Sequence, residues 1–164
     1  MIPFIEQAQC YAASHQHPVS RYTHMVGIPL LLLSGMILLG FIHIVIIGVC
    51  SLNLAYLVTL GLIGHYARLN WRLALILTPL LLLLLLVAHF FTDKGPTCFA
   101  IWSFVILLVL GAALQLVGIL VEGKRPATTE ILWQTLIAPL CLVAEVAFLF
   151  GQLPDLHVAI HGKH

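Results

Sequence analysis

The sequence predicts an all-α protein, a polytopic bundle of about five transmembrane helices that forms a single membrane domain over residues 1–164. The chain is 62% hydrophobic and only 8% charged, whereas soluble domains carry roughly 25% charged residues. Residues 25–66 contain no Asp, Glu, Lys or Arg, and long apolar runs alternate with short polar segments along the rest of the chain. A surface this poor in charge suits lipid rather than water.

The apolar runs place the individual spans. A span needs about 20 apolar residues, so residues 25–66 are too long for one helix. We expect a break at the polar sequence CSLN, residues 50–53. Further polar segments follow each later run, and Pro139 interrupts the last one. The expected spans cover about residues 26–48, 52–66, 71–91, 98–121 and 131–151.

Five spans put the two ends of the chain on opposite sides of the membrane. The N-terminal side then holds five basic residues, Arg21, Arg68, Arg72, Lys124 and Arg125, against Lys94 and Lys163 on the other side. The positive-inside rule therefore predicts a cytoplasmic N-terminus, in a bacterial inner membrane or the endoplasmic reticulum. The net charge of +1 gives no reason to expect a nucleic-acid partner.

This topology gathers metal-binding side chains on the N-terminal side. The imidazoles of His15, His17 and His24 precede or open the first span, His65 closes the second, and Glu122 follows the fourth. Histidine and carboxylate are the ligands of zinc and non-haem iron sites. Pro18 disfavours helix at the residue before it, so a bend there could bring His15 and His24 together. The alternative is that these histidines lie at the lipid headgroup level as amphipathic side chains.

The other polar residues in or beside the expected spans can be explained without a metal site. Glu145 lies inside the fifth span, where a carboxylate is costly unless it is paired or neutral. We expect it to make a functional or structural polar contact within the bundle. His43 and His89 are expected to be hydrogen-bonded polar groups of the bundle. Basic residues at a cytoplasmic interface follow from topology alone.

Two motifs resemble those of a known family. The first has the form H-x-x-P-x-N-x-x-x-H-x-x-x-x-P and is matched by His15, Pro18, Ser20, His24 and Pro29. The second has the form Q-F-x-G-H, then E-x-x-R-P-A, then L-x-x-P and E. Its matches are Gln115, Gly118, Glu122, Arg125, Pro126, Ala127, Pro139 and Glu145. Together, over residues 11–151, they resemble the 2-hydroxy fatty acid dioxygenase family of the yeast phytosphingosine-breakdown enzyme.

The resemblance implies an iron(II)-dependent dioxygenase that shortens 2-hydroxy fatty acids by one carbon, an α-oxidation step at the cytoplasmic membrane face. Its partners would be the 2-hydroxy fatty acid, O2 and membrane lipid, with Fe(2+) as cofactor and Zn(2+) as the alternative metal. His15 and His24 match family histidines expected to bind the iron. We assign catalytic roles to His15, His24 and Glu122. Substrate carboxylate binding is assigned to the cations of Arg68, Lys124 and Arg125.

The chain departs from the family pattern at two positions. The family asparagine is Ser20, and the histidine of the Gly-His pair is Ile119. His65 or His17 could take the place of that missing ligand. If neither does, the alternative is a catalytically inactive membrane protein, a metal- or lipid-binding scaffold. A small transporter is the least favoured class, because the spans lack paired Gly/Pro-broken helices. The oligomeric state does not follow from the sequence.

Overall fold

The computed structural model describes residues 18–46, 50–123, 138–144 and 146. The elements are α2 (Pro18–Gly40), β1 (His43–Ile46), β2 (Cys50–Asn53), α3 (Leu54–Leu69), α4 (Trp71–Thr92) and α5 (Cys98–Glu122). Residues 138–144 are also helical. The predicted all-α class is confirmed, with one antiparallel hairpin of β1 and β2 added to the described helices.

Three of the described helices are long and apolar enough to cross a membrane. They are α2 from Val19 onward, α4, and α5 as far as Val121. At 1.5 Å per residue each reaches beyond the roughly 30 Å of a hydrocarbon core. Most of the surface of α5 is exposed and apolar, as expected of a helix that faces lipid. The apolar helix α3 has only 16 residues.

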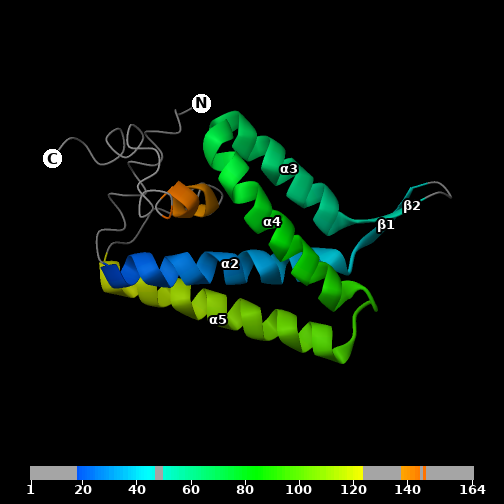
Figure 1. Ribbon diagram of the computed structural model, residues 1–164. Helices are drawn as coiled ribbons and strands as arrows, with labels where there is room; N and C mark the ends of the chain where they lie inside the picture. Colours follow the sequence, from blue (N-terminus) through cyan, green and yellow to red (C-terminus); the bar gives the residue numbers. More distant parts are fainter. Residues whose placement is uncertain (1–17, 47–49, 124–137, 145, 147–164) are drawn as a thin grey trace.

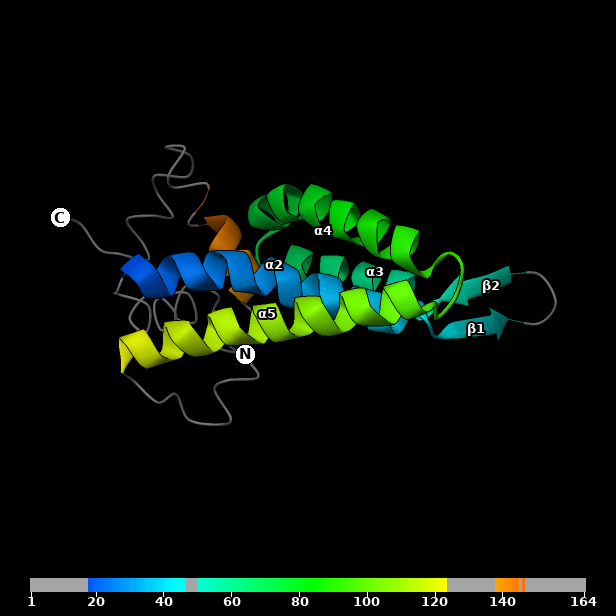
Figure 2. The ribbon, with the colours of Figure 1, turned by 90° about the horizontal axis from the view of Figure 1, so that it is seen from below.

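The helices form two antiparallel pairs. In Figure 1, α2 and α5 run side by side along their whole length, and α3 and α4 form a second pair, of which α4 crosses α2 obliquely. Figure 2, seen from below, shows the same pairing, with the β1–β2 hairpin projecting beyond the helices. The start of α2 and the end of α5 therefore lie together at one end of the bundle. The connection between α3 and α4 is directed toward that end but lies apart from it (Figures 1 and 2).

The core lies where α4 and residues 138–144 pack against α2. Leu73, Leu77 and Leu81 recur at four-residue spacing on α4 and are almost fully buried, because that spacing keeps them on one helix face. They pack with Ile37 of α2 and Leu140 in one apolar cluster. This cluster holds α2 in place while leaving its other side for α5.

The first predicted span is displaced. The sequence placed it at residues 26–48, but α2 begins at Pro18 and ends at Gly40. Proline fits the first helical position because its missing N–H needs no partner there. As a result Pro29 lies in the helix interior. Residues 43–46 read His-Ile-Val-Ile, a largely β-branched run that suits a strand.

The later spans agree more closely. The expected break at residues 50–53 is a break between helices, although it is strand β2 and not a simple turn. The expected spans 71–91 and 98–121 each differ from α4 and α5 by one residue. The expected span 52–66 corresponds to α3, which starts two residues later and runs to Leu69. Of the expected span 131–151, residues 138–144 are described and are helical.

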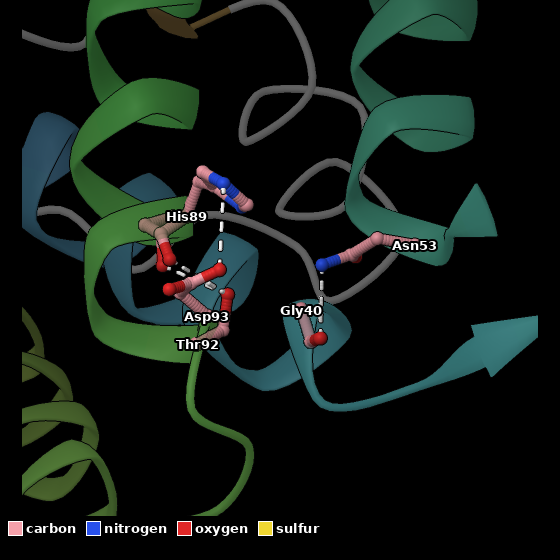
Figure 3. Close-up of polar contacts among 6 residues, drawn as sticks. Gly40, Asn53, His89, Thr92 and Asp93 are labelled. Carbon is pink, nitrogen blue, oxygen red and sulfur yellow. Dashed lines mark hydrogen bonds and ion pairs between the residues drawn. The ribbon is translucent and has the colours of Figure 1, made fainter. Parts of the chain in front are cut away.

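Asn53 joins the end of α2 to the start of α3. Its Oδ1 accepts a hydrogen bond from the Ala55 N–H at 2.9 Å, which caps α3. Its Nδ2 donates to the Gly40 carbonyl at 2.9 Å, as Figure 3 shows. Gly40 in turn has no room for a side chain, because a Cβ there would lie 2.7 Å from Thr92 Cγ2. One buried amide thus satisfies backbone groups at two helix ends.

Asn53→Ala is expected to lower the free energy of unfolding by about 2 kcal/mol, since it removes a helix cap and a buried hydrogen bond together. The matched control is Asn70→Ala. The Asn70 side chain caps α4 through bonds of 3.2 and 3.4 Å and makes no further hydrogen bond to the described residues, so its loss should cost at most about 1 kcal/mol. Unfolding of the purified variants in mixed detergent would measure both. Equal losses would contradict the double role of Asn53.

Candidate functional site: the junction of α2 and α5

Glycines bring α2 and α5 into close contact. A Cβ added to Gly27 would lie 3.3 Å from the Gly111 carbonyl oxygen, and one added to Gly111 would lie 2.8 Å from Leu31 Cγ. A Cβ at Gly118 would overlap Cε1 and Nδ1 of the His24 ring. The absence of side chains at these positions lets the helix backbones approach and lets one imidazole fit between them.

His24 is the buried histidine of this junction. It lies six residues after the start of α2, about 9 Å along the helix axis, and is 7% exposed. Its Nδ1 is 2.8 Å from the Ser20 carbonyl oxygen. A carbonyl oxygen can only accept, so Nδ1 carries the proton and donates it. In the neutral form of the ring this leaves the lone pair on Nε2, which is the arrangement that metal-binding histidines use.

Further polar groups surround this ring. Thr23 Oγ1 donates to the same Ser20 carbonyl at 2.9 Å and would lie 2.8 Å from a Cβ at Gly118. One turn deeper along the helix pair, Gln115 Nε2 lies 3.4 Å from the place of a Cβ on Gly27. Ser20 is fully buried. The hydroxyls of Thr23 and Ser20, the Gln115 carboxamide and the His24 imidazole thus lie along one helix interface.

The end of α5 brings position 122 to the same junction. Position 122 is four residues after Gly118 and lies on the same helix face. Directly after it, Gly123 adopts φ +67° and its N–H donates to the Ile119 carbonyl at 3.2 Å, which ends the helix. The predicted catalytic residue Glu122 is therefore positioned by its backbone at the α2–α5 end of the bundle. Its side chain lies outside the described residues.

Ile119 lies at the partly exposed edge of this junction. It follows Gly118 by one residue, a rotation of about 100° around the helix, and its side chain is 37% exposed. The sequence identified position 119 as the place of a missing family histidine. Ile119 also follows Gln115 by four residues, so it lies at the edge of the α5 face that packs against α2, whereas the His24 ring packs against Gly118 itself.

The remaining predicted site residues divide into two groups. His65 and Arg68 lie on α3: the His65 ring packs edge-on against Tyr66 at 5.8 Å, and Arg68 is exposed near the connection to α4. Among the side chains that the structure describes, no three of His, Cys, Asp or Glu are grouped closely enough to hold a metal. The metal set therefore stays a prediction. The other predicted residues lie outside the described ranges: His15, His17, Lys124, Arg125 and Glu145.

Sequence reasoning assigned no site role to Thr23 or Gln115 and did not foresee the close packing at Gly27, Gly111 and Gly118, although Gln115 and Gly118 are matches of the second motif. A signal for them was present. Gly111, Gln115, Gly118 and position 122 follow one another at spacings of four, three and four residues, which marks one face of a helix. A face made of small and polar residues within an apolar span indicates close packing against another helix.

Comparison with known proteins identifies the family to which the chain belongs. Residues 1–150 match the family described as 2-hydroxy-palmitic acid dioxygenase Mpo1-like. No curated protein and no solved structure matches the chain significantly. The match covers nearly all of the chain, including both motifs and the α2–α5 junction where described residues of those motifs meet. The chain belongs to the 2-hydroxy-palmitic acid dioxygenase Mpo1-like family.

Proposed function

We propose that the protein is an iron(II)-dependent dioxygenase that shortens 2-hydroxy fatty acids by one carbon. The observation that carries the proposal is His24, a buried imidazole held by the Ser20 carbonyl against Gly118, with Nε2 as its acceptor nitrogen. Membership of the family suggests a dioxygenase acting on a 2-hydroxy fatty acid. The junction of α2 and α5 is the region we assign to this activity.

The donor set at the junction suits iron. A histidine whose Nδ1–H is bound to a backbone carbonyl has its ring orientation and tautomer fixed for binding through Nε2. We assign the iron to His24 and His15, with His65 or His17 as a third nitrogen ligand and Glu122 as a catalytic carboxylate. Histidine and carboxylate together are the ligands of oxygen-activating iron sites, and Zn(2+) is the alternative metal. When bound, iron(II) would supply the activation of O2.

The substrate's two ends suit different parts of the bundle. An acyl chain can lie along the exposed apolar surface of the helices, while its carboxylate and 2-hydroxyl reach the polar end where α2 begins. His24 lies about 9 Å from the start of α2, at a depth that such a polar end can reach. Arg68, Lys124 and Arg125 are assigned to the carboxylate as cations. By the positive-inside rule this end faces the cytoplasm.

The alternative function is a catalytically inactive scaffold that binds metal or lipid. Its motivation was isoleucine at position 119 in place of the family histidine. The enzyme is favoured by His24, because its ring is buried against Gly118 and its Nδ1 is bound to the Ser20 carbonyl without any contribution from residue 119.

Metal analysis and oxygen uptake test the proposal. We expect the purified full chain to bind about one iron per molecule, and to consume O2 with 2-hydroxypalmitate while forming a product one carbon shorter. Palmitate, which lacks the 2-hydroxyl, should cause no uptake. A protein that binds lipid stoichiometrically but consumes no O2 with either acid would support the scaffold instead.

A further inference from the structure

The Ser20 hydroxyl is a buried polar group without a partner. Ser20 is fully buried, and its Oγ makes no hydrogen bond to any residue that the structure describes. A serine inside a helix ordinarily donates to a carbonyl three or four residues earlier, as Ser34 of α2 does to Leu31 at 2.8 Å. Ser20 is the third residue of α2, so the carbonyls at those distances precede the helix.

Such a hydroxyl is costly in a protein interior, because it has lost its hydrogen bonds to water and gained none. Buried polar side chains almost always have a partner, and each exception calls for an explanation. The main chain of Ser20 does not supply a hydrogen-bond partner for this hydroxyl. Its carbonyl already accepts from Thr23 Oγ1 and from His24 Nδ1, which leaves the hydroxyl as the unsatisfied group.

The helix register puts this hydroxyl beside the candidate site. Leu31 lies against Gly111, and seven residues earlier His24 lies against Gly118, which is seven residues later on α5. Extending this antiparallel register by four residues places Ser20 across from position 122. Ser20 is also one helical turn from His24 and therefore on the same face of α2. The orphan hydroxyl is thus between two positions that we assign to the site.

We propose that Ser20 Oγ hydrogen-bonds the 2-hydroxyl group of the bound fatty acid and so selects hydroxylated over plain acyl acids. The inference rests on the proposed function, whose substrate class it refines. A hydroxyl both donates and accepts, so it pairs with another hydroxyl in either direction. A site built to bind a substrate hydroxyl discriminates against the analogue that lacks it, because the protein group is then left unpaired.

The partner is the 2-hydroxyl and not the carboxylate. A buried carboxylate needs a cation or several donors to offset its lost hydration, and a single serine hydroxyl is too weak for that. Arg21, the nearest described cation along α2, is exposed at the helix surface. A neutral hydroxyl has a much smaller desolvation cost and is matched by one neutral hydrogen bond. Ser20 is therefore suited to the neutral group of the substrate's polar end.

Ser20→Ala tests this inference through binding alone. The dissociation constants of 2-hydroxypalmitate and palmitate would be measured for the purified full chain without O2. We expect the wild type to prefer the hydroxylated acid, and the variant to lose about fivefold to tenfold of that preference, the effect of one hydrogen bond. Without ligand, the thermal midpoint of the variant should be unchanged or higher, because the removed hydroxyl had no partner.

Ser34→Ala is the matched control, since Ser34 is equally buried on the same helix but already hydrogen-bonded. It should keep the full preference for the hydroxylated acid. An unchanged preference in Ser20→Ala, no preference in the wild type, or a large drop in the ligand-free midpoint would each overturn the inference. Loss of preference in a protein that never consumes O2 would refute the proposed function alone. Turnover with an unchanged preference would refute the role of Ser20 alone.

Discussion

His24→Ala is expected to remove bound iron and to lower turnover of 2-hydroxypalmitate by at least about 100-fold. Loss of a residue that only supports a metal ligand typically costs 10- to 100-fold in metal affinity or activity, and we assign His24 to the metal itself. Its burial and its fixed tautomer at 2.8 Å from the Ser20 carbonyl are the basis of that assignment. Metal content and O2 uptake of the purified variant would measure the effect.

His89→Ala is the control for this variant. His89 lies near the end of α4, at the opposite end of the bundle, with its side chain 50% exposed and its Nε2 3.9 Å from Asp93 Oδ1 (Figure 3). An exposed pair of this kind contributes little to stability, so iron content and turnover should stay at wild-type levels. Equal losses in both variants, or retained iron in His24→Ala, would show that His24 does not hold the metal.

Gly118→Ala is expected to reduce turnover about 100-fold while leaving every proposed ligand in the sequence. The new Cβ would overlap the His24 ring and come within 2.8 Å of Thr23 Oγ1, so the ring must move or the helices must separate. A displacement of about 1 Å at a catalytic group can cost about 100-fold in rate. Overpacking of the interface should also lower the free energy of unfolding by about 1–3 kcal/mol. Turnover and unfolding would be measured on the same preparation.

The same substitution at Gly35 should have the opposite effect on stability. Gly35 is also in a helix, α2, but a Cβ there would meet nothing within 4 Å. Alanine is the better helix former, so Gly35→Ala should raise the free energy of unfolding by about 0.5–1 kcal/mol. Turnover should stay unchanged. Wild-type turnover and iron content in Gly118→Ala would contradict the close packing of His24 against α5.

Composition and apolar length were enough to predict the helical class and the positions of α4 and α5 to within one residue. These features depend on the local chain: an apolar run of sufficient length between polar segments forms a helix that suits lipid. The same reasoning misplaced α2 by eight residues at each end. It gave too little weight to Pro18 as a helix start and to the β-branched run that begins after His43.

The candidate site was predicted only in part. Topology indicated that the start of α2 and the end of α5 would share one end of the bundle, and the structure agrees. It did not indicate that His24 would pack against Gly118 or that the Ser20 carbonyl would accept hydrogen bonds from Thr23 and His24. The predicted assembly of His65 with the other histidines remains a prediction, since its described ring contact is with Tyr66.

By itself the sequence determined the apolar, helical class of this protein, its family, and the residue types that are available for chemistry. The tertiary structure decided which of them meet. Contacts between helices depend on their register and separation, and at this junction both follow from the missing side chains of Gly27, Gly111 and Gly118. The periodicity of one helix shows which residues share a face. It contains no information about the residue on the partner helix that the face will meet, because that is set by packing across the interface.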